Sequence, residues 1–413
     1  MALGIYISVP FCKTKCSYCN FASDVFSRAA FERYVSRVCA DIEHAPQIAA
    51  EMGGRIEREV DSIYLGGGTP TVLHPEQLQR IFESLRDQFS VLPGAEITVE
   101  CAPGTLTPQV LDTLLACGVN RVSLGVQSFV DAEAAAVGRL HQRATVVDDI
   151  SRLRASGITN INIDLIAGLP HQTPQSWQLS LDQTIATGAP HVSVYMLEVD
   201  EDSRLGREVI AGGTRYHAHF VPDEEATADF YVAAGEALEA AGIAQYEISN
   251  FARPGFESRH NLKYWTRQPY LGFGVDAHSM LARDREGHDF SRAAARQETD
   301  LGFSPWGPEA VRFATADSLE TYVKGMPLQP TIVSRDSAVE EYFFLGLRLN
   351  RGVDLQELSQ RYGHEAAERA QSTVEELMSD ELLESRGDRI RLTSRGRLLS
   401  NEVFQRFLAP TVL

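Results

Sequence analysis

The sequence predicts an α/β protein, with a partial (β/α)6 barrel followed by a smaller, mainly helical C-terminal domain. Short apolar runs alternate with amphipathic stretches through the first half of the chain, and residues with reactive side chains follow the ends of those runs. This alternation indicates parallel strands joined by right-handed crossovers, with a site at the carboxyl ends of the strands. Six units are too few for a full eight-unit barrel, so we expect an open barrel that admits a large ligand.

The expected strands and helices follow each other along the first half of the chain. The strands are the short apolar runs at 3–9, 61–65, 95–100, 119–125, 159–166 and 191–199. The helices between them are the amphipathic stretches at 31–42, 75–89, 108–116, 144–155 and 174–187. Two of these helices begin at Thr107-Pro108 and Thr173-Pro174, where a capping residue precedes a proline in the first turn. A further helix is expected at 222–242 and a strand or edge element at 244–249.

The expected domains are a barrel over 1–282, a connecting region over 283–335 and a helical domain over 336–413. The polar, aperiodic stretch 283–306 predicts a loop. In the last domain, helices expected at 339–349, 355–362 and 365–378 precede alternating residues around a Gly-Asp turn at 382–392, which is typical of a hairpin, and then a last helix. This order of elements is typical of a winged-helix-like module, and it would also suit a cap over the open side of the barrel. The excess of acidic residues argues against DNA binding and therefore favours the cap.

Composition excludes several classes of function. The 413 residues are 44% hydrophobic and 23% charged, which is typical of a globular protein. A net charge of −18 argues against a general nucleic-acid binder. No apolar run approaches the length of a membrane span and no signal-peptide pattern opens the chain, so we expect a cytoplasmic protein. Its cysteines are then ligands or free thiols rather than disulfides, and Cys39, Cys101 and Cys117 are expected to be buried.

A cysteine array directly follows the first apolar run. Cys12, Cys16 and Cys19 have the spacing C-x3-C-x2-C, and the next cysteine is as distant as Cys39. A closed zinc site or a complete iron–sulfur site would take a fourth protein ligand. Three thiolates on one loop therefore indicate a 4Fe–4S cluster with one iron open to another ligand. The alternatives are three buried thiols or half of a zinc site.

Further polar residues follow the ends of the expected strands. Gly66-Gly67-Gly68-Thr69-Pro70 comes after the second strand, and glycines there let the backbone approach a ligand closely. The other polar positions are Glu100, Gln127, Arg139 and Asp164. Two carboxylates can accept hydrogen bonds from an amine and from ribose hydroxyls, and a guanidinium can bind a carboxylate. Each residue alone is more often a satisfied polar group. Their shared face of the barrel favours a ligand site.

The cysteine array resembles the signature of the radical S-adenosylmethionine superfamily. The resemblance implies that the amine and carboxylate of S-adenosylmethionine chelate the open iron, and that an electron from the cluster releases a 5′-deoxyadenosyl radical. The glycine trio resembles the GGE-type motif that holds the methionine amine in this superfamily.

A closer resemblance runs from residue 3 to about residue 280, with a fainter match in the C-terminal domain. The order Y-I-x-V-P-F-C, GGGTPT, E-x-x-P-G, GVQSF, GR-x-H and D-L-I-x-GLP resembles the oxygen-independent coproporphyrinogen III oxidases and their relatives, the HemW haem chaperones. The resemblance implies S-adenosylmethionine contacts from Tyr6, Tyr18, Gly67, Gly68, Thr69, Glu100, Gln127, Arg139 and Asp164. Leu197, Glu198 and the loop 272–278 are expected to add backbone or packing contacts.

The segment R-H-N-L-K-Y-W at 259–265 bears on the choice between these two relatives. A neutral imidazole is a good axial ligand for haem iron, and Arg259 or Lys263 can meet a propionate. On the residues alone, a packed or hydrogen-bonded histidine is the more common case. The segment resembles the H-N-x-x-Y-W motif of the chaperones, and this resemblance favours His260 as the haem ligand. His217 and His219, in H-x-H spacing, are weaker candidates for a metal pair or a second haem contact.

Two departures from the oxidases favour the chaperone. Tyr6 lies close to Met1, so we expect the N-terminal extension of the oxidases to be absent, and Phe21 stands where their pattern has a further cysteine.

The expected function is to bind haem, a 4Fe–4S cluster and S-adenosylmethionine and to deliver haem to recipient haemoproteins, expected to be respiratory enzymes. The alternatives are the oxidase itself and a regulatory module with a redox-sensing cluster. The cluster would need an electron donor, and nucleic acid is not an expected partner. A homodimer and membrane contact through the recipients stay open.

Overall fold

Six parallel strands form the centre of the fold, which is known from a computed structural model that describes residues 1–283 and 310–408. These strands are β1 (Leu3–Val9), β3 (Glu59–Gly67), β4 (Ser90–Cys101), β5 (Arg121–Gln127), β6 (Asn160–Ala167) and β7 (His191–Met196). They pair in the order β1-β3-β4-β5-β6-β7, and every pair is parallel. The open barrel that the sequence predicts is confirmed, with each strand at its expected place.

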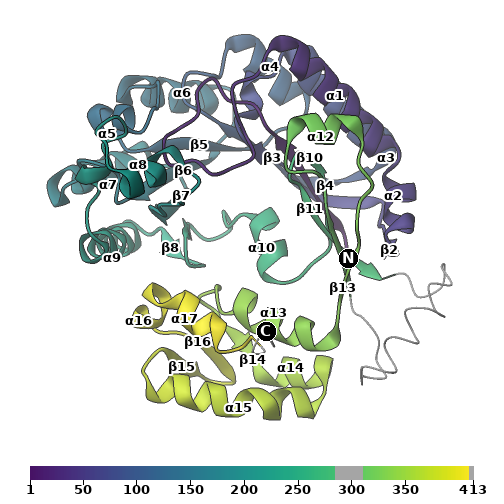
Figure 1. Cartoon of the computed structure of the whole chain (residues 1–413), viewed down its shortest axis with the longest axis vertical. Helices are drawn as coiled ribbons and strands as arrows, with labels where there is room; N and C mark the ends of the chain where they lie inside the picture. The colour runs from purple at the N-terminus through teal and green to yellow at the C-terminus, as the bar shows by residue number, and fades with distance from the viewer. Residues whose placement is uncertain (284–309, 409–413) are drawn as a thin grey trace.

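Helices cover the outer face of the curved sheet, as Figure 1 shows. The helices between successive strands are α1 (Arg28–Glu43), α3 (Pro75–Gln88), α4 (Pro108–Ala116), α6 (Arg143–Ala155) and α7 (Pro174–Thr187), and α9 (Glu224–Ala240) follows β7. Thr107 and Thr173 cap α4 and α7, since each side chain accepts a hydrogen bond from a backbone N–H of the first turn. The shorter elements are α2 (Ala45–Glu51), α5 (Asp131–Ala136), α8 (Arg204–Ala211), η1 (Pro70–Val72) and η2 (Ala218–Phe220).

The sheet continues beyond the six strands at both edges. Beside β1 lie β10 (Tyr270–Gly274), β11 (His278–Arg283), β12 (Ala310–Ala314) and β13 (Thr331–Val333), with β2 (Gly54–Arg55) paired to β11. Beside β7 lie β9 (Asn250–Ala252) and β8 (Ala244–Gln245). The expected connecting region therefore contributes β12, α12 (Leu319–Lys324) and β13 to the barrel side. The loop expected at 283–306 falls, after Arg283, outside the described residues. The domain boundaries stay a prediction.

A separate unit near the C-terminus lies across the open side of the barrel (Figure 1). It contains α13 (Arg335–Gly346), β14 (Val353–Asp354), α14 (Leu355–Tyr362), α15 (His364–Ser379), β15 (Leu383–Arg386), β16 (Arg389–Leu392), α16 (Ser394–Leu398) and α17 (Ser400–Gln405). The hairpin expected at 382–392 is present as the antiparallel pair β15–β16. An apolar cluster fills this unit and extends to Met280 and Ala310 of the barrel side. Within it the rings of Phe343 and Phe407 stack with centroids 4.4 Å apart.

Helix α10 (Arg259–Trp265) closes the end of the barrel where the strands begin. The carboxylate of Glu96, on β4, accepts hydrogen bonds from the backbone N–H groups of Arg259 (3.1 Å) and His260 (3.2 Å) at the helix start. A carboxylate is stabilising at a helix N-terminus. Lys263 Nζ reaches Asp61 at 2.7 Å and the carbonyl oxygen of Ala2 at 2.9 Å. These contacts anchor α10 on the first strands of the barrel.

No helix among residues 1–283 and 310–408 combines the length and the apolar character needed to cross a lipid bilayer.

Candidate cofactor site

The three cysteines of the array lie on the loop that leaves the carboxyl end of β1. All three are free thiols, and Cys16 is buried while Cys12 and Cys19 are half-buried. Backbone hydrogen bonds hold the loop at several points: Cys12 N–H donates to Asp24 (3.0 Å) and Ser17 N–H donates to Val137 (3.1 Å). The loop is therefore fixed to neighbouring elements before any cofactor binds.

Two of the three sulfur atoms accept hydrogen bonds from residues that the sequence places at the same site. Thr69 Oγ1 lies 3.7 Å from Cys12 Sγ, and Arg139 Nη1 lies 3.7 Å from Cys16 Sγ. Donors to sulfur favour the thiolate, and they tune an iron–sulfur cluster once it is bound.

The three thiols lie near one another: burial raises the pKa of Cys12, and the charges of Cys19 and Cys16 add to that rise. In the part of the chain that the structure describes, no three or more His, Cys, Asp or Glu side chains converge as the ligands of one metal ion. A multi-iron cluster takes its cysteine ligands on different irons, so the cysteines surround it instead of meeting at a point.

The glycine loop after β3 lies directly against the start of the cysteine loop. The backbone N–H of Gly68 donates to Val9 O and that of Thr69 donates to Phe11 O, both at 2.7 Å. A Cβ atom on Gly68 would lie 2.6 Å from Phe11 O, and Gly67 has a φ of +95°. Side chains are excluded at both positions, so the glycines are required for the two loops to lie together.

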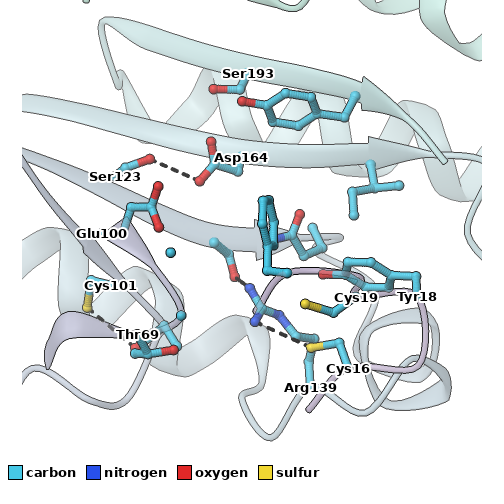
Figure 2. Close-up of a pocket in the computed structure, with 18 of the residues that line it drawn as sticks. Cys16, Tyr18, Cys19, Thr69, Glu100, Cys101, Ser123, Arg139, Asp164 and Ser193 are labelled. Atoms are coloured by element: carbon cyan, nitrogen blue, oxygen red, sulfur yellow. Dashed lines mark hydrogen bonds between the residues drawn. The ribbon is translucent and has the colours of Figure 1, made fainter. Parts of the chain in front are cut away.

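A cavity of about 760 Å³ lies at this end of the barrel and reaches the C-terminal unit. Its volume is within the usual range for cofactor and ligand sites. The predicted site residues that line it are Cys12, Cys16, Cys19, Tyr18, Gly67, Gly68, Thr69, Glu100, Gln127, Arg139 and Asp164. Leu197 and Glu198 line it too, as expected. Figure 2 shows Cys16, Cys19 and Arg139 on one side of this pocket and Glu100 and Asp164 on the other.

Two half-buried carboxyl groups, those of Glu100 and Asp164, face the cavity from β4 and β6. Burial and the charge of Asp164 raise the pKa of Glu100 to about 7, although the Tyr64 hydroxyl donates to Glu100 Oε1 at 2.9 Å. Burial also raises the pKa of Asp164, against hydrogen bonds from Ser123 Oγ (3.0 Å) and Asn162 Nδ2 (2.7 Å). Two carboxylates confined in one cavity favour a cationic ligand, such as an ammonium or sulfonium group.

Several buried polar atoms of the cavity wall have no hydrogen-bond partner. Arg139 donates to Cys16 and to the carbonyl oxygen of Gly125, yet its Nε is unpartnered, as is Asn250 Oδ1. Gln127 has a positive φ of 67°, at a register irregularity of β5. Buried polar groups normally find partners, so these atoms fit a polar ligand in the cavity. The residues present thus suit both a cluster and a nucleoside.

Tyr6 lies deeper in the barrel than the other predicted contacts. It is not among the residues that line the cavity, and its ring centroid is 6.1 Å from that of Tyr64 and 6.3 Å from that of His260. Tyr64 does line the cavity and lies next to Tyr6. The role expected for Tyr6 in binding S-adenosylmethionine stays a prediction.

His260 is buried inside the barrel with both ring nitrogens occupied. Nδ1 lies 3.1 Å from the Ser62 hydroxyl and Nε2 lies 2.9 Å from the Tyr264 hydroxyl. Burial and the charge of Lys263 lower the pKa of His260 to about 3, so the imidazole is neutral, as iron ligation requires. Only 1% of the residue is exposed, and a haem iron reaches it only after α10 shifts. Ligation by His260 stays a prediction.

The histidines of the H-x-H segment do not pair with each other. The strand that would place them on one side is absent, because residues Ala218–Phe220 form the short helix η2. His217 Nδ1 instead lies 3.1 Å from Nε2 of His171, and the His219 ring packs on Phe220 with centroids 4.1 Å apart. The H-x-H spacing therefore does not bring the two imidazoles together as a metal pair.

Sequence reasoning missed several residues of the cavity wall. These are Tyr64, Arg121, Ser193 and Asn250 of the barrel and Arg348 of the C-terminal unit. Arg121 carried a usable signal, since a charged residue that opens an apolar strand is rare without a reason. Arg348 carried none, because only the tertiary structure brings it to the cavity.

Comparisons with known proteins agree with this geometry. Residues 6–183 match the model of the radical SAM superfamily, and residues 333–399 match that of the HemN C-terminal domain. The haem chaperone HemW of Lactococcus lactis is 31% identical over 411 residues, which cover 98% of this chain and 97% of the relative. The chain belongs to the HemW family.

Other relatives support the same assignment. The HemW haem chaperone of Bacillus subtilis is 32% identical over 405 residues, covering 98% of both chains. The solved structure of coproporphyrinogen III oxidase (HemN) from Escherichia coli, a radical SAM enzyme, superposes with a TM-score of 0.80 at 24% identity, covering 100% of this chain and 91% of the other. This likeness shows that the HemW chain has the HemN fold.

Proposed function

We propose that this member of the HemW family is a haem chaperone, which binds haem together with a 4Fe–4S cluster and S-adenosylmethionine. The similarity to HemW haem chaperones along 98% of the chain carries the proposal, because it spans the barrel and the C-terminal unit. The cavity between these two parts supports it.

The cofactors are assigned to the residues that the site brings together. Cys12, Cys16 and Cys19 hold the cluster, which when bound supplies an electron and an open iron for the methionine moiety. The S-adenosylmethionine contacts are assigned to Tyr6, Tyr18, Gly67, Gly68, Thr69, Glu100, Gln127, Arg139 and Asp164. Glu100 and Asp164 bind the positively charged groups of the ligand, and Arg139 donates a hydrogen bond to the sulfur of Cys16. The glycine loop lets the ligand approach the backbone closely.

Haem ligation is assigned to His260, whose buried ring must first become accessible to the iron. The ring must exchange its hydrogen bond with Tyr264 for iron, and α10 must move enough to expose it. The proposed chaperone therefore has a closed form, with His260 buried, and a haem-binding form.

Delivery completes the proposal. Haem passes to recipient haemoproteins, which we propose to be respiratory enzymes, and an electron donor reduces the cluster. The six free cysteines suit the reducing cytoplasm. We keep the three-part organisation of 1–282, 283–335 and 336–413 as a proposal for the domains.

Haem retention tests the function. Protein with its cluster reconstituted anaerobically is incubated with haem and desalted, and we expect a Soret band in the wild type that is lost in His260→Ala. His191→Ala is the matched control, because His191 is also buried in the barrel with both ring nitrogens hydrogen-bonded. Transfer of the haem to an apo-haemoprotein completes the assay. Anaerobic turnover of coproporphyrinogen III to protoporphyrinogen IX would instead establish the oxidase activity.

A further inference from the structure

A buried arginine at the start of β5 has no hydrogen-bonded acceptor for its guanidinium among the described residues, although its charge opposes the raised pKa of Glu100 and Asp164. Arg121 is 1% exposed and its side chain lines the cavity. Its Nε has no hydrogen-bond partner, and within residues 1–283 and 310–408 its guanidinium makes no hydrogen bond or ion pair. Burying a cation without a paired acceptor is costly, so such a residue is retained where a ligand supplies the anion.

A second arginine with an unpartnered Nε lines the same cavity from the C-terminal unit. Arg348 follows α13, and its guanidinium lies over the ring of Trp265, 4.4 Å from the ring centroid. Its Nε also lacks a hydrogen-bond partner. Stacking on an aromatic ring holds a guanidinium in place while its N–H groups stay available for another acceptor.

Electrostatic interactions connect the two guanidiniums with the dipeptide Tyr246-Glu247. Burial and the charge of Glu247 raise the pKa of Tyr246, and the charge of Arg121 opposes that rise. Burial raises the pKa of Glu247, and the charge of Arg348 opposes it. Glu247 nevertheless forms no ion pair with Arg348 in the described part of the chain, and its Oε1 accepts from Asn250. Both arginines therefore line the cavity, and within the described part of the chain neither has a hydrogen-bonded carboxylate.

The cations of the 259–265 segment are already engaged elsewhere. Arg259 Nη1 donates to the carbonyl oxygen of Gly94 at 2.9 Å, and Lys263 Nζ pairs with Asp61 at 2.7 Å. Neither residue lines the cavity, although both were candidates for binding a propionate.

We propose that Arg121 and Arg348 anchor the two carboxylates of a dicarboxylate ligand, which, resting on the proposed function, are the propionates of a tetrapyrrole. The planar fork of a guanidinium binds a carboxylate in a bidentate manner. Arg121 opens β5, so it lies toward the end of the barrel where α10 and His260 are found. The methionine carboxylate of S-adenosylmethionine has the same chemistry, but its assigned place is at the cysteine loop, at the opposite ends of the strands.

Esterified haem tests the proposal. Cluster-reconstituted wild type, Arg121→Met and Arg348→Met are titrated with haem and with haem dimethyl ester, whose propionates carry no charge. We expect the wild type to bind the ester about tenfold to a hundredfold more weakly than haem, the usual effect of losing hydrogen bonds to charged groups. In each variant haem affinity falls and the ratio of haem to ester affinity moves toward one.

Equilibrium dialysis with S-adenosylmethionine separates the two carboxylate sources. Unchanged S-adenosylmethionine binding in both variants supports the propionate assignment. Equal affinity of the wild type for haem and its ester overturns the anchoring and leaves the chaperone function standing, whereas no haem binding at all overturns both. Weakened S-adenosylmethionine binding with an unchanged haem-to-ester ratio assigns the arginines to that cofactor and overturns the proposal.

Melting temperatures control for misfolding. Arg121→Met removes a buried charge that makes no ion pair within the described residues but that also opposes the raised pKa of Glu100, so we expect its melting temperature to stay close to that of the wild type. Should Arg121→Met fail to fold, Arg121→Lys keeps the charge without the bidentate fork and is expected to give an intermediate haem-to-ester ratio. An unchanged ratio in Arg121→Lys would then overturn the role of Arg121.

Discussion

Nε2 of His260 lies 2.9 Å from the Tyr264 hydroxyl, one turn further along α10. This hydrogen bond occupies the atom that a haem iron would take, so it competes with ligation. Replacing Tyr264 with Phe frees Nε2 and is expected to raise haem affinity by up to about tenfold, the usual worth of one net hydrogen bond. Haem titration followed at the Soret band measures the change.

Tyr342→Phe is the control for this variant, since its hydroxyl is also hydrogen-bonded, to the carbonyl oxygen of Asp354 at 2.9 Å, but in the C-terminal unit. We expect its haem affinity to equal that of the wild type. A Tyr264→Phe protein that binds haem no better, while His260→Ala abolishes binding, would show that movement of α10 and not the hydrogen bond limits access.

The cysteine array gives a sharper prediction. Cys16→Ser removes one of three cluster ligands, and we expect iron and acid-labile sulfide to fall from about four of each per chain to near zero after anaerobic reconstitution. The expected loss follows because the remaining two thiolates hold too few irons. Cys101→Ser is the matched control: this cysteine is also buried, burial raises its pKa to about 12, and its thiol lies 3.4 Å from the Thr105 hydroxyl. It ends β4 and is not part of the cysteine loop. Iron lost equally in both variants would contradict the cluster assignment.

The strands and the loops of the site could be predicted for a simple reason. Buried parallel strands are nearly continuous apolar runs, as in β1 and β6, and the cysteine and glycine loops immediately follow such runs. The capping residues of α4 and α7 are also set by the local sequence, because each one contacts the first turn of its own helix. Features set within a few residues are therefore accessible from sequence.

What could not be predicted depends on contacts between distant segments. β10 pairs with β1 from more than half the chain away, and its glycine-rich sequence carries little strand signal. The ring nitrogens of His260 are occupied by Ser62 and Tyr264, and only the first of these contacts is distant in sequence. The approach of Arg348 to the cavity depends on how the C-terminal unit docks.

Glu100 is expected to make stability depend on pH. Burial and Asp164 raise the pKa of this carboxyl from 4.5 to about 7, against Tyr64, the Gly67 N–H and Arg121. Between these two values the folded protein holds a proton that the unfolded chain has released, so stability falls as pH rises from about 4.5 to 7. Above pH 7 this destabilisation reaches its full value, a loss of about 3 kcal/mol in the free energy of unfolding.

Glu100→Gln removes this ionisation, so the protein is expected to gain stability at pH 8 and little at pH 5. Urea unfolding over a pH series measures both. Glu239→Gln, on the exposed face of α9, should change the profile by less than about 0.5 kcal/mol. A Glu100→Gln curve parallel to that of the wild type across the series would refute the assignment of the raised pKa to Glu100.

Glu341 links the barrel to the C-terminal unit through buried charge. Its carboxylate lies 2.8 Å from Arg267 Nε, just beyond α10, and 2.7 Å from Arg312 Nη1 on β12. Glu341→Gln takes this charge from two cations at once, and we expect the free energy of unfolding to fall by about 3–5 kcal/mol, as for other broken buried ion pairs. Chemical denaturation gives the value.

The exposed pair of Glu320 and Lys324 provides the comparison, since both side chains are at least 70% exposed at a distance of 2.6 Å. Glu320→Gln is expected to change the free energy of unfolding much less than Glu341→Gln does, because water screens the pair. Because Arg267 directly follows the segment that carries His260, Glu341→Gln should also speed haem uptake if the ion pair restrains α10. Similar small losses in both variants would mean that the unit is held on the barrel by apolar contacts and not by this charge network.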